Sequence, residues 1–129
     1  MPRAALANAD ARPATVRAQS PTTERVRLRA AELAAVGIPA PAHVADLTDS
    51  DQAADLVAAA VAEHGPVTVL INNAGMTSLT SPESLVPATD MSDEQWERGL
   101  RRNVSTAFHV TRAALPAMRD AKHGSISSA

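Results

Sequence analysis

The residues best suited to chemistry form a short polar motif that follows an apolar run. Residues 66–71 read Pro-Val-Thr-Val-Leu-Ile, and the chain continues into Asn72, Asn73, Ala74 and Gly75. Such a β-branched run is typical of a strand buried on both faces of a parallel sheet, and ligands bind beyond the carboxyl ends of such strands. Glycine lets the backbone approach a ligand closely, and asparagine side chains can bond neighbouring strand ends. The motif therefore predicts a ligand-binding edge at residues 72–75.

Composition excludes several other chemistries. The 129 residues include no cysteine, which excludes disulfides and thiolate metal sites and fits a reducing cytoplasm. The four histidines lack metal-ligand spacing, so we predict no metal site. A net charge of -2 provides no basic surface for nucleic acid, and no apolar stretch approaches membrane-spanning length. We expect a single cytoplasmic domain that binds neither nucleic acid nor membrane.

The chain begins with an irregular segment and then becomes regular. Residues 1–21 contain Pro2, Pro13 and Pro21 and show no clear period, so we expect poor order or one poor strand around residues 14–18. The spacing of apolar residues then predicts helices at residues 22–37 and 50–64, and strands at residues 40–46 and 67–71. The expected inner stripe of the second helix is Ala53, Ala54, Val57 and Val61.

A long helix follows a polar loop at residues 76–91. Ser92 and Gln95 have capping-box spacing and open a helix at residues 92–121. Pro116 should kink this helix or begin its last turn, and Gly124 should close it before a strand from residue 125 onward. The apolar stripe of this helix is Trp96, Leu100, Val104, Phe108 and Leu115. Helices that alternate with strands at this spacing indicate an α/β class with a parallel sheet.

Four segments in a fixed order resemble the short-chain dehydrogenase/reductase family. They are "HVADLTD" with Asp46, the motif at residues 72–75, "QWERGLRRNVSTAFHVTRAALPAM" with Asn103, and "HGSISSA". The resemblance covers residues 22–129, and the branch that it resembles most is the 3-oxoacyl-acyl-carrier-protein reductases. It implies a partial dinucleotide-binding, Rossmann-like domain at residues 22–129, preceded by the irregular residues 1–21.

The resemblance also implies cofactor contacts. Asp46 ends a strand on the ligand side, where its carboxylate can accept a hydrogen bond from the adenine amino group of a dinucleotide. The alternative is that Asp46 caps the turn that follows it, and both roles can hold together. For Asn72, Asn73, Ala74 and Gly75 the alternatives are scaffolding of the sheet end and backbone contact with the cofactor.

The resemblance also implies a catalytic role for Asn103 and raises the question of one for Ser128. Asparagine is a poor residue for a helix interior because its side chain competes for backbone hydrogen bonds. In the family, the asparagine at the position of Asn103 helps to hold a water in a proton relay; without the resemblance Asn103 would be a solvent-facing residue. Ser128 corresponds to the serine that hydrogen-bonds the substrate carbonyl only if three preceding residues have been lost, and otherwise neither Ser127 nor Ser128 is that serine.

Other parts that the family needs are missing from these residues. The family's proton donor is the tyrosine of a Tyr-x-x-x-Lys pair, and the chain has no tyrosine. Its glycine-rich turn holds the pyrophosphate after the first strand, and no glycine precedes Thr22. We therefore expect an incomplete Rossmann-like, doubly wound parallel sheet, with the first strand and the C-terminal third absent. A gap at the centre of the sheet would leave the strand at residues 67–71 as an exposed edge and make folding marginal.

The resulting expectation is an NAD(P)-dependent oxidoreductase, similar to a 3-oxoacyl-acyl-carrier-protein reductase, of which this chain is a fragment inactive alone. The resemblance to this branch implies that its cofactor is NADP, with NAD possible. Arg17 or Ser20, in the region of the second strand's end, would suit a phosphate. Its substrate would be a small or acyl-carrier-bound carbonyl compound, and it would form a homo-oligomer through helix 92–121. The alternatives are a non-catalytic fragment that pairs with an intact relative through that helix, or a truncated product without function.

Overall fold

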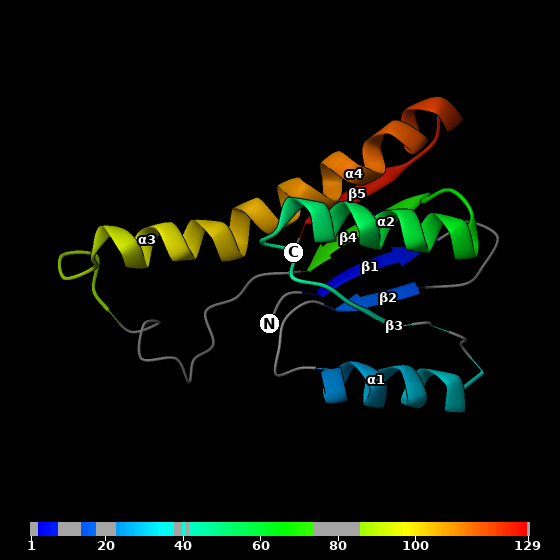
Figure 1. The fold of residues 1–129 in the computed structure, drawn as a ribbon, viewed down its shortest axis with the longest axis horizontal. Helices are drawn as coiled ribbons and strands as arrows, with labels where there is room; N and C mark the ends of the chain where they lie inside the picture. The colour runs from blue at the N-terminus through cyan, green and yellow to red at the C-terminus, as the bar shows by residue number, and fades with distance from the viewer. Residues whose placement is uncertain are drawn as a thin grey trace.

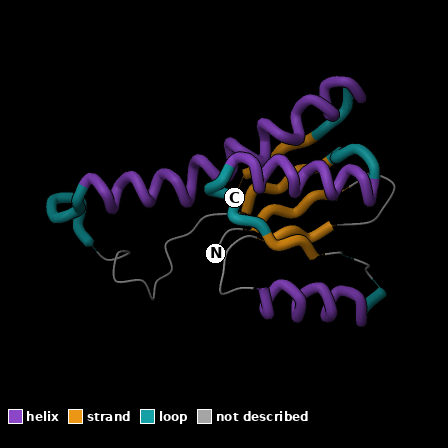
Figure 2. The backbone as a smooth tube through the Cα atoms, in the orientation of Figure 1, coloured by secondary structure: helices purple, strands orange, loops and turns teal. Residues whose placement is uncertain are grey.

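The protein folds as helices packed on both faces of one sheet (Figures 1 and 2). The computed structural model describes residues 3–7, 14–17, 23–37, 40, 42–73 and 86–128. The elements in chain order are β1 (Arg3–Ala7), β2 (Ala14–Arg17), α1 (Thr23–Ala35), β3 (Ala42–Val44), α2 (Ser50–His64), β4 (Val69–Asn73), α3 (Asp93–Leu100), η2 (Arg101–Ser105), α4 (Thr106–Ala121) and β5 (Ser125–Ser128). Helices α2 and α4 pack together over one face, and α1 covers the other.

The sheet has five strands in the order β3-β2-β1-β4-β5. Strands β2 and β3 are parallel, as are β4 and β5, whereas β1 runs antiparallel to both of its neighbours, β2 and β4. Strands β2, β3, β4 and β5 therefore share one direction, and their successive connections pass through α1, α2 and α4. The α/β class predicted from the alternating pattern and the doubly wound sheet implied by the family resemblance are both confirmed, with one reversed strand at the centre of the sheet.

The reversal of β1 follows from the length of its connection to β2. A parallel neighbour requires a crossover of about a dozen residues or more, usually with a helix, whereas antiparallel neighbours can be joined by a short link. Only residues 8–13 separate β1 from β2. This link is too short for a crossover helix, so adjacent β1 and β2 pair antiparallel.

The expectation of a gap at the centre of the sheet was wrong. Strand β1 fills the position between β2 and β4, so β4 is an interior strand with β5 on its other side. Buried backbone groups on both neighbours require partners, and residues 3–7 supply them. Strand β1 has no glycine-rich turn to mark it in the sequence, because strand pairing needs only an extended backbone. The poor strand predicted around residues 14–18 is confirmed as β2.

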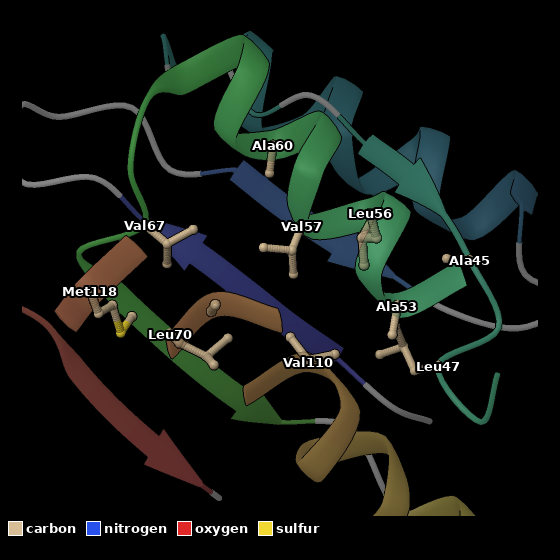
Figure 3. Close-up of a cluster of buried hydrophobic side chains, with 11 residues drawn as sticks. Ala45, Leu47, Ala53, Leu56, Val57, Ala60, Val67, Leu70, Val110 and Met118 are labelled. Atoms are coloured by element: carbon tan, nitrogen blue, oxygen red, sulfur yellow. The ribbon is translucent and has the colours of Figure 1, made fainter. Parts of the chain in front are cut away.

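Helix α2 supplies much of the core. Asp49 caps its first turn, and Gly65, with φ of 82°, ends it. Its buried residues are Ala53, Leu56, Val57 and Ala60, which follow the spacing of one helical face. The predicted stripe was therefore wrong at Ala54, which is exposed. Figure 3 shows the cluster, whose members are Ala45, Leu47, Ala53, Leu56, Val57, Ala60, Val67, Leu70, Val110, Ala114 and Met118.

The long helix begins as predicted but is not regular throughout. Ser92 and Gln95 form the predicted capping box. The helix then passes through the π-helical segment η2, which the sequence did not predict, and continues through Pro116 within α4. It ends at Ala121, as the predicted range 92–121 requires, but the residue that closes it is Lys122, which adopts a left-handed conformation with φ of 52°, and not the expected Gly124.

Candidate functional site

The candidate site residues gather at the edge where the parallel strands end. Asp46 follows β3, Asn72 and Asn73 end β4, and Ser128 ends β5. Because parallel strands present their carboxyl ends at one edge of a sheet, the fold brings the ends of these strands to the same side. Ala74 and Gly75 lie outside the described residues.

Asn72 anchors this edge to the helical layer. It is only 3% exposed, and its side-chain Nδ2 donates a hydrogen bond to Thr111 Oγ1 on α4 at 3.0 Å. Its Oδ1 has no hydrogen-bond partner among the described residues. The neighbouring Asn73 points to the other face and is exposed. The two asparagines therefore differ in role, because the first secures β4 to α4 whereas the second is available at the edge.

Asp46 organises the turn that follows β3. Its Oδ1 accepts hydrogen bonds from the Thr48 backbone N–H at 2.9 Å and from Thr48 Oγ1 at 2.7 Å. Its own backbone N–H donates to Gln52 Oε1 at 3.0 Å. The turn-capping interpretation of Asp46 thus describes its contacts within the chain, and contact with an adenine ring stays a prediction.

The N-terminus of α2 adjoins this turn and is already occupied by a carboxylate. Asp49 Oδ1 accepts from the backbone N–H groups of Asp51 and Gln52 at 2.9 and 3.2 Å. The hydrogen bonds from Gln52 and Asp51 hold the pKa of Asp49 below its usual value. The positive end of this helix is therefore satisfied from within the chain and does not offer an anion site.

His109 forms a contact that the sequence did not reveal. Its Nδ1 lies 3.0 Å from the carbonyl oxygen of Leu47, and since a carbonyl only accepts, Nδ1 carries the proton and donates. Leu47 is 1% exposed, so this bond satisfies the backbone of a buried residue. It joins α4 to the turn that carries Asp46. The sequence carries no signal of this partner, which lies 62 residues away in the chain.

Asn103 lies within the π-helical segment η2 and is exposed. Its Nδ2 donates to the Gly99 carbonyl at 2.9 Å, which in a regular α-helix would accept from the backbone N–H of Asn103. Thr106 Oγ1 donates to the Arg102 carbonyl in the same way at 2.9 Å. Side chains thus stabilise the widened turn from both of its ends. Single π turns occur frequently at functional sites, which fits the role that the resemblance implies for Asn103.

Among the described residues, Asn103 forms no hydrogen bond with the candidate residues at this edge. Thr111, which contacts Asn72, is two turns or about 12 Å along the helix from Asn103. The side-chain bond of Asn103 is made within its own helix. Ser128 is exposed and in register with Asn72, and Ser127 is in register with Ile71. Register partners share a face of the sheet, so Ser128, and not Ser127, lies on the face of Asn72.

The described residues do not fit a dinucleotide bound as Rossmann-like folds usually bind it. In those folds the pyrophosphate lies at the N-terminus of the helix that follows the central strand. Here the central strand β1 ends at the opposite edge, because Ala7 is in register with Val69, at the start of β4, whereas Arg3 is in register with Asn73. Among the described residues, this edge of the sheet therefore has Asp46, Asn72 and Asn73 but lacks the pyrophosphate site that the fold usually provides. The described residues also contain no cluster able to bind a metal ion and no helix able to cross a membrane.

Comparisons with known proteins agree with this architecture. A metagenomic short-chain oxidoreductase solved in complex with NADP is 31% identical, with a TM-score of 0.72 over 88% of this chain and 48% of that one. A variant of actinorhodin polyketide ketoreductase with NADPH is 30% identical, with a TM-score of 0.73 over 86% of this chain and 40% of that one.

Sequence relatives lead to the same family. A (5R,7aS)-5-hydroxy-7a-methyl-1-oxo-2,3,5,6,7,7a-hexahydro-1H-indene-carboxyl-CoA reductase of Mycobacterium tuberculosis is 40% identical over 75% of this chain and 35% of its own. The 3-oxoacyl-[acyl-carrier-protein] reductase FabG of Thermotoga maritima is 33% identical over 65% of this chain and 32% of its own. The chain thus spans about a third of these relatives. The family model described as short chain dehydrogenase matches residues 3–128, and the chain belongs to this family.

Proposed function

We propose that this chain is the central portion of an NAD(P)-dependent carbonyl reductase similar to the 3-oxoacyl-acyl-carrier-protein reductases. The observation that carries the proposal is the buried amide of Asn72, which is the penultimate residue of β4 and secures this ligand-side edge to α4 through Thr111. The relative from Thermotoga maritima is a reductase of this name, and the relative from Mycobacterium tuberculosis is named as the reductase of a carboxyl-CoA compound. The substrate class is therefore a small or carrier-bound carbonyl compound.

NADP is the cofactor that we propose for the complete protein, with NAD as the alternative. Solved relatives contain NADP or NADPH. In this fold the residue at the end of the second strand discriminates between the 2′-hydroxyl and the 2′-phosphate, and Arg17 is the last residue of β2. An arginine at that place favours the phosphate. The location that we propose is the cytoplasm, which the absence of cysteine from these 129 residues fits.

The chain's own contribution to catalysis is proposed to be Asn103, with Ser128 as a second candidate. The π turn around Asn103 departs from regular helical bonding at the position where the family holds the water of its proton relay. The family's tyrosine is required as proton donor, and the chain has no tyrosine. We therefore expect the 129 residues alone to be inactive.

The direct test is a kinetic assay of the complete protein encoded by the reading frame that contains these residues. NADPH consumption is followed at 340 nm with a 3-oxoacyl thioester as substrate, and the 129-residue chain serves as the control. We expect turnover by the complete protein and none by the chain alone. Absence of turnover with thioester and small ketone substrates alike would remove the carbonyl reductase proposal.

A second candidate function rests on the exposed apolar side of the long helix. Trp96, Val104 and Phe108 are 57%, 59% and 56% exposed, and α3 buries none of its residues. Such a stripe is typical of a helix that packs against a partner. We propose that residues 92–121 pair with the same helix of a second copy or of an intact relative. Co-purification of the chain with a full-length reductase tests this, and no association at micromolar concentration would remove it.

A further inference from the structure

We infer that β1 takes, in the reverse direction, the place of the strand that leads into the dinucleotide-binding turn of this fold, so that the chain as folded does not bind the dinucleotide. The inference concerns the 129-residue chain and goes beyond the function proposed for the complete protein. It rests on three observations about the backbone: the register of β1, the length of its link to β2, and the pairing of both its edges.

The register fixes the direction of β1. Arg3 is paired with Asn73 on β4 and with Arg17 on β2, both of which end their strands. Arg3 therefore lies at the ligand-side edge, where the fold would place the end of its first strand and the start of the glycine-rich turn. The carboxyl end of β1, from which that turn would emerge, is at the other edge.

The link between β1 and β2 is also too short to contain the helix that follows the glycine-rich turn in this fold. In this fold the helix between the first and second strands presents its N-terminal N–H groups to the pyrophosphate. Residues 8–13 are too few for a parallel crossover with a helix. The neighbouring N-terminus of α2 is capped by Asp49, whose carboxylate would repel a phosphate. Neither position can take over the pyrophosphate.

The pairing on both edges makes β1 part of the fold. It pairs with β2 through residues 3–6 and with β4 through residues 3–7. Its departure would leave the backbone groups of two interior strands without partners, and such groups are costly to leave unpaired. A dinucleotide would therefore have to compete with two strand ladders in order to enter.

Engineered cysteine pairs can determine the direction of β1, since the chain contains no cysteine of its own. The pair Arg3→Cys with Asn73→Cys joins residues that face one another in the observed register. Antiparallel partners have Cα atoms about 4.5–5.5 Å apart, within disulfide reach. The pair Ala7→Cys with Asn73→Cys would be adjacent only if β1 ran parallel. Ala5→Cys with Ile71→Cys is the matched control, because this central pair is adjacent in either direction.

We expect the first and control pairs to form a disulfide under mild oxidation and the Ala7–Asn73 pair to stay reduced. A disulfide between positions 7 and 73, with none between positions 3 and 73, would overturn the inference. If neither the first pair nor the control pair formed a disulfide, β1 would not be in the sheet, which would also overturn it.

The unmodified chain provides the second measurement. NADPH is titrated into it and followed by cofactor fluorescence and equilibrium dialysis. We expect no saturable binding up to about 1 mM, a concentration at which even very weak specific sites begin to fill. Saturable binding at micromolar NADPH would overturn the inference while strengthening the proposed function. Lack of turnover by the complete protein would instead remove the proposed function and leave the crosslinking result intact.

Discussion

Asn72 and Thr111 are joined by a hydrogen bond of 3.0 Å in which the side-chain amide donates to the hydroxyl. The bond crosses from the end of β4 to the middle of α4, and Asn72 is almost fully buried where it is made. The ligand-side edge of the sheet and the helix that carries Asn103 are therefore held in one arrangement.

Replacing Thr111 by valine should destabilise the fold by about 1–3 kcal/mol, because the buried amide of Asn72 then loses its partner. Thr111→Ser keeps the hydroxyl and is the matched control, with a smaller loss. Urea denaturation measures both variants. No loss of stability in the valine variant would mean that the hydrogen bond from Asn72 contributes nothing to stability.

Asp49 should make stability depend on pH in the acid range. Its pKa is lowered in the folded state by the backbone N–H groups of Gln52 and Asp51, so its contribution is present above its usual pKa of about 3.9 and is lost as the pH falls through the lowered value. Asp49→Asn keeps a capping side chain without the charge. Thermal melts between pH 2 and 6 should show a weaker pH dependence for this variant than for the native chain. An unchanged profile would assign the acid sensitivity to other carboxylates.

His109→Ala should destabilise the turn after β3 because the buried carbonyl of Leu47 loses its donor. The expected cost is about 1–3 kcal/mol, with faster amide exchange at residues 45–49. His123 is exposed, and His123→Ala should stay within about 0.5 kcal/mol of the native chain. If both variants behave alike, the His109 bond contributes nothing to stability.

Two glycine positions should respond in opposite ways to alanine. A Cβ on Gly124 would lie 2.8 Å from Met118 Cγ and Sδ, so Gly124→Ala should cost about 1–3 kcal/mol through overpacking. A Cβ on Gly99, within α3, would meet nothing within 4 Å, so Gly99→Ala should stabilise by about 0.5–1 kcal/mol. Chemical denaturation of the two variants compares them directly, and a destabilising Gly99→Ala would contradict the observed packing.

The regular parts of this fold could be predicted because their signals are local. The cap and stop of α2 at Asp49 and Gly65, and the capping box at Ser92, depend only on residues within a turn of one another. The alternation of helix and strand patterns was likewise sufficient for the class of the fold.

The features that could not be predicted from the sequence depend on contacts between distant segments, or on backbone conformations that no residue type strongly favours. The place and direction of β1 depend on the short link to β2 and on two neighbouring strands that need partners. The left-handed Lys122 ends α4 where glycine is the usual signal. The bond from His109 to Leu47 exists only once α4 has packed over the turn after β3. At the site, the position of Asn72 near the carboxyl end of its strand was predicted and its contact with a cofactor stays a prediction, whereas its partner Thr111 could not be identified before the packing was known.

The measurement that tests the central claim most directly is a comparison of the complete protein with its Asn103→Ala variant. Turnover of NADPH with a 3-oxoacyl thioester and the affinity for NADPH are measured for both. If Asn103 supports proton transfer, turnover should fall by about 10-fold or more while the affinity changes little, since general acid–base groups contribute about 10²–10⁴-fold. Equal losses in turnover and affinity, or no NADPH consumption by the unaltered protein, would contradict this account.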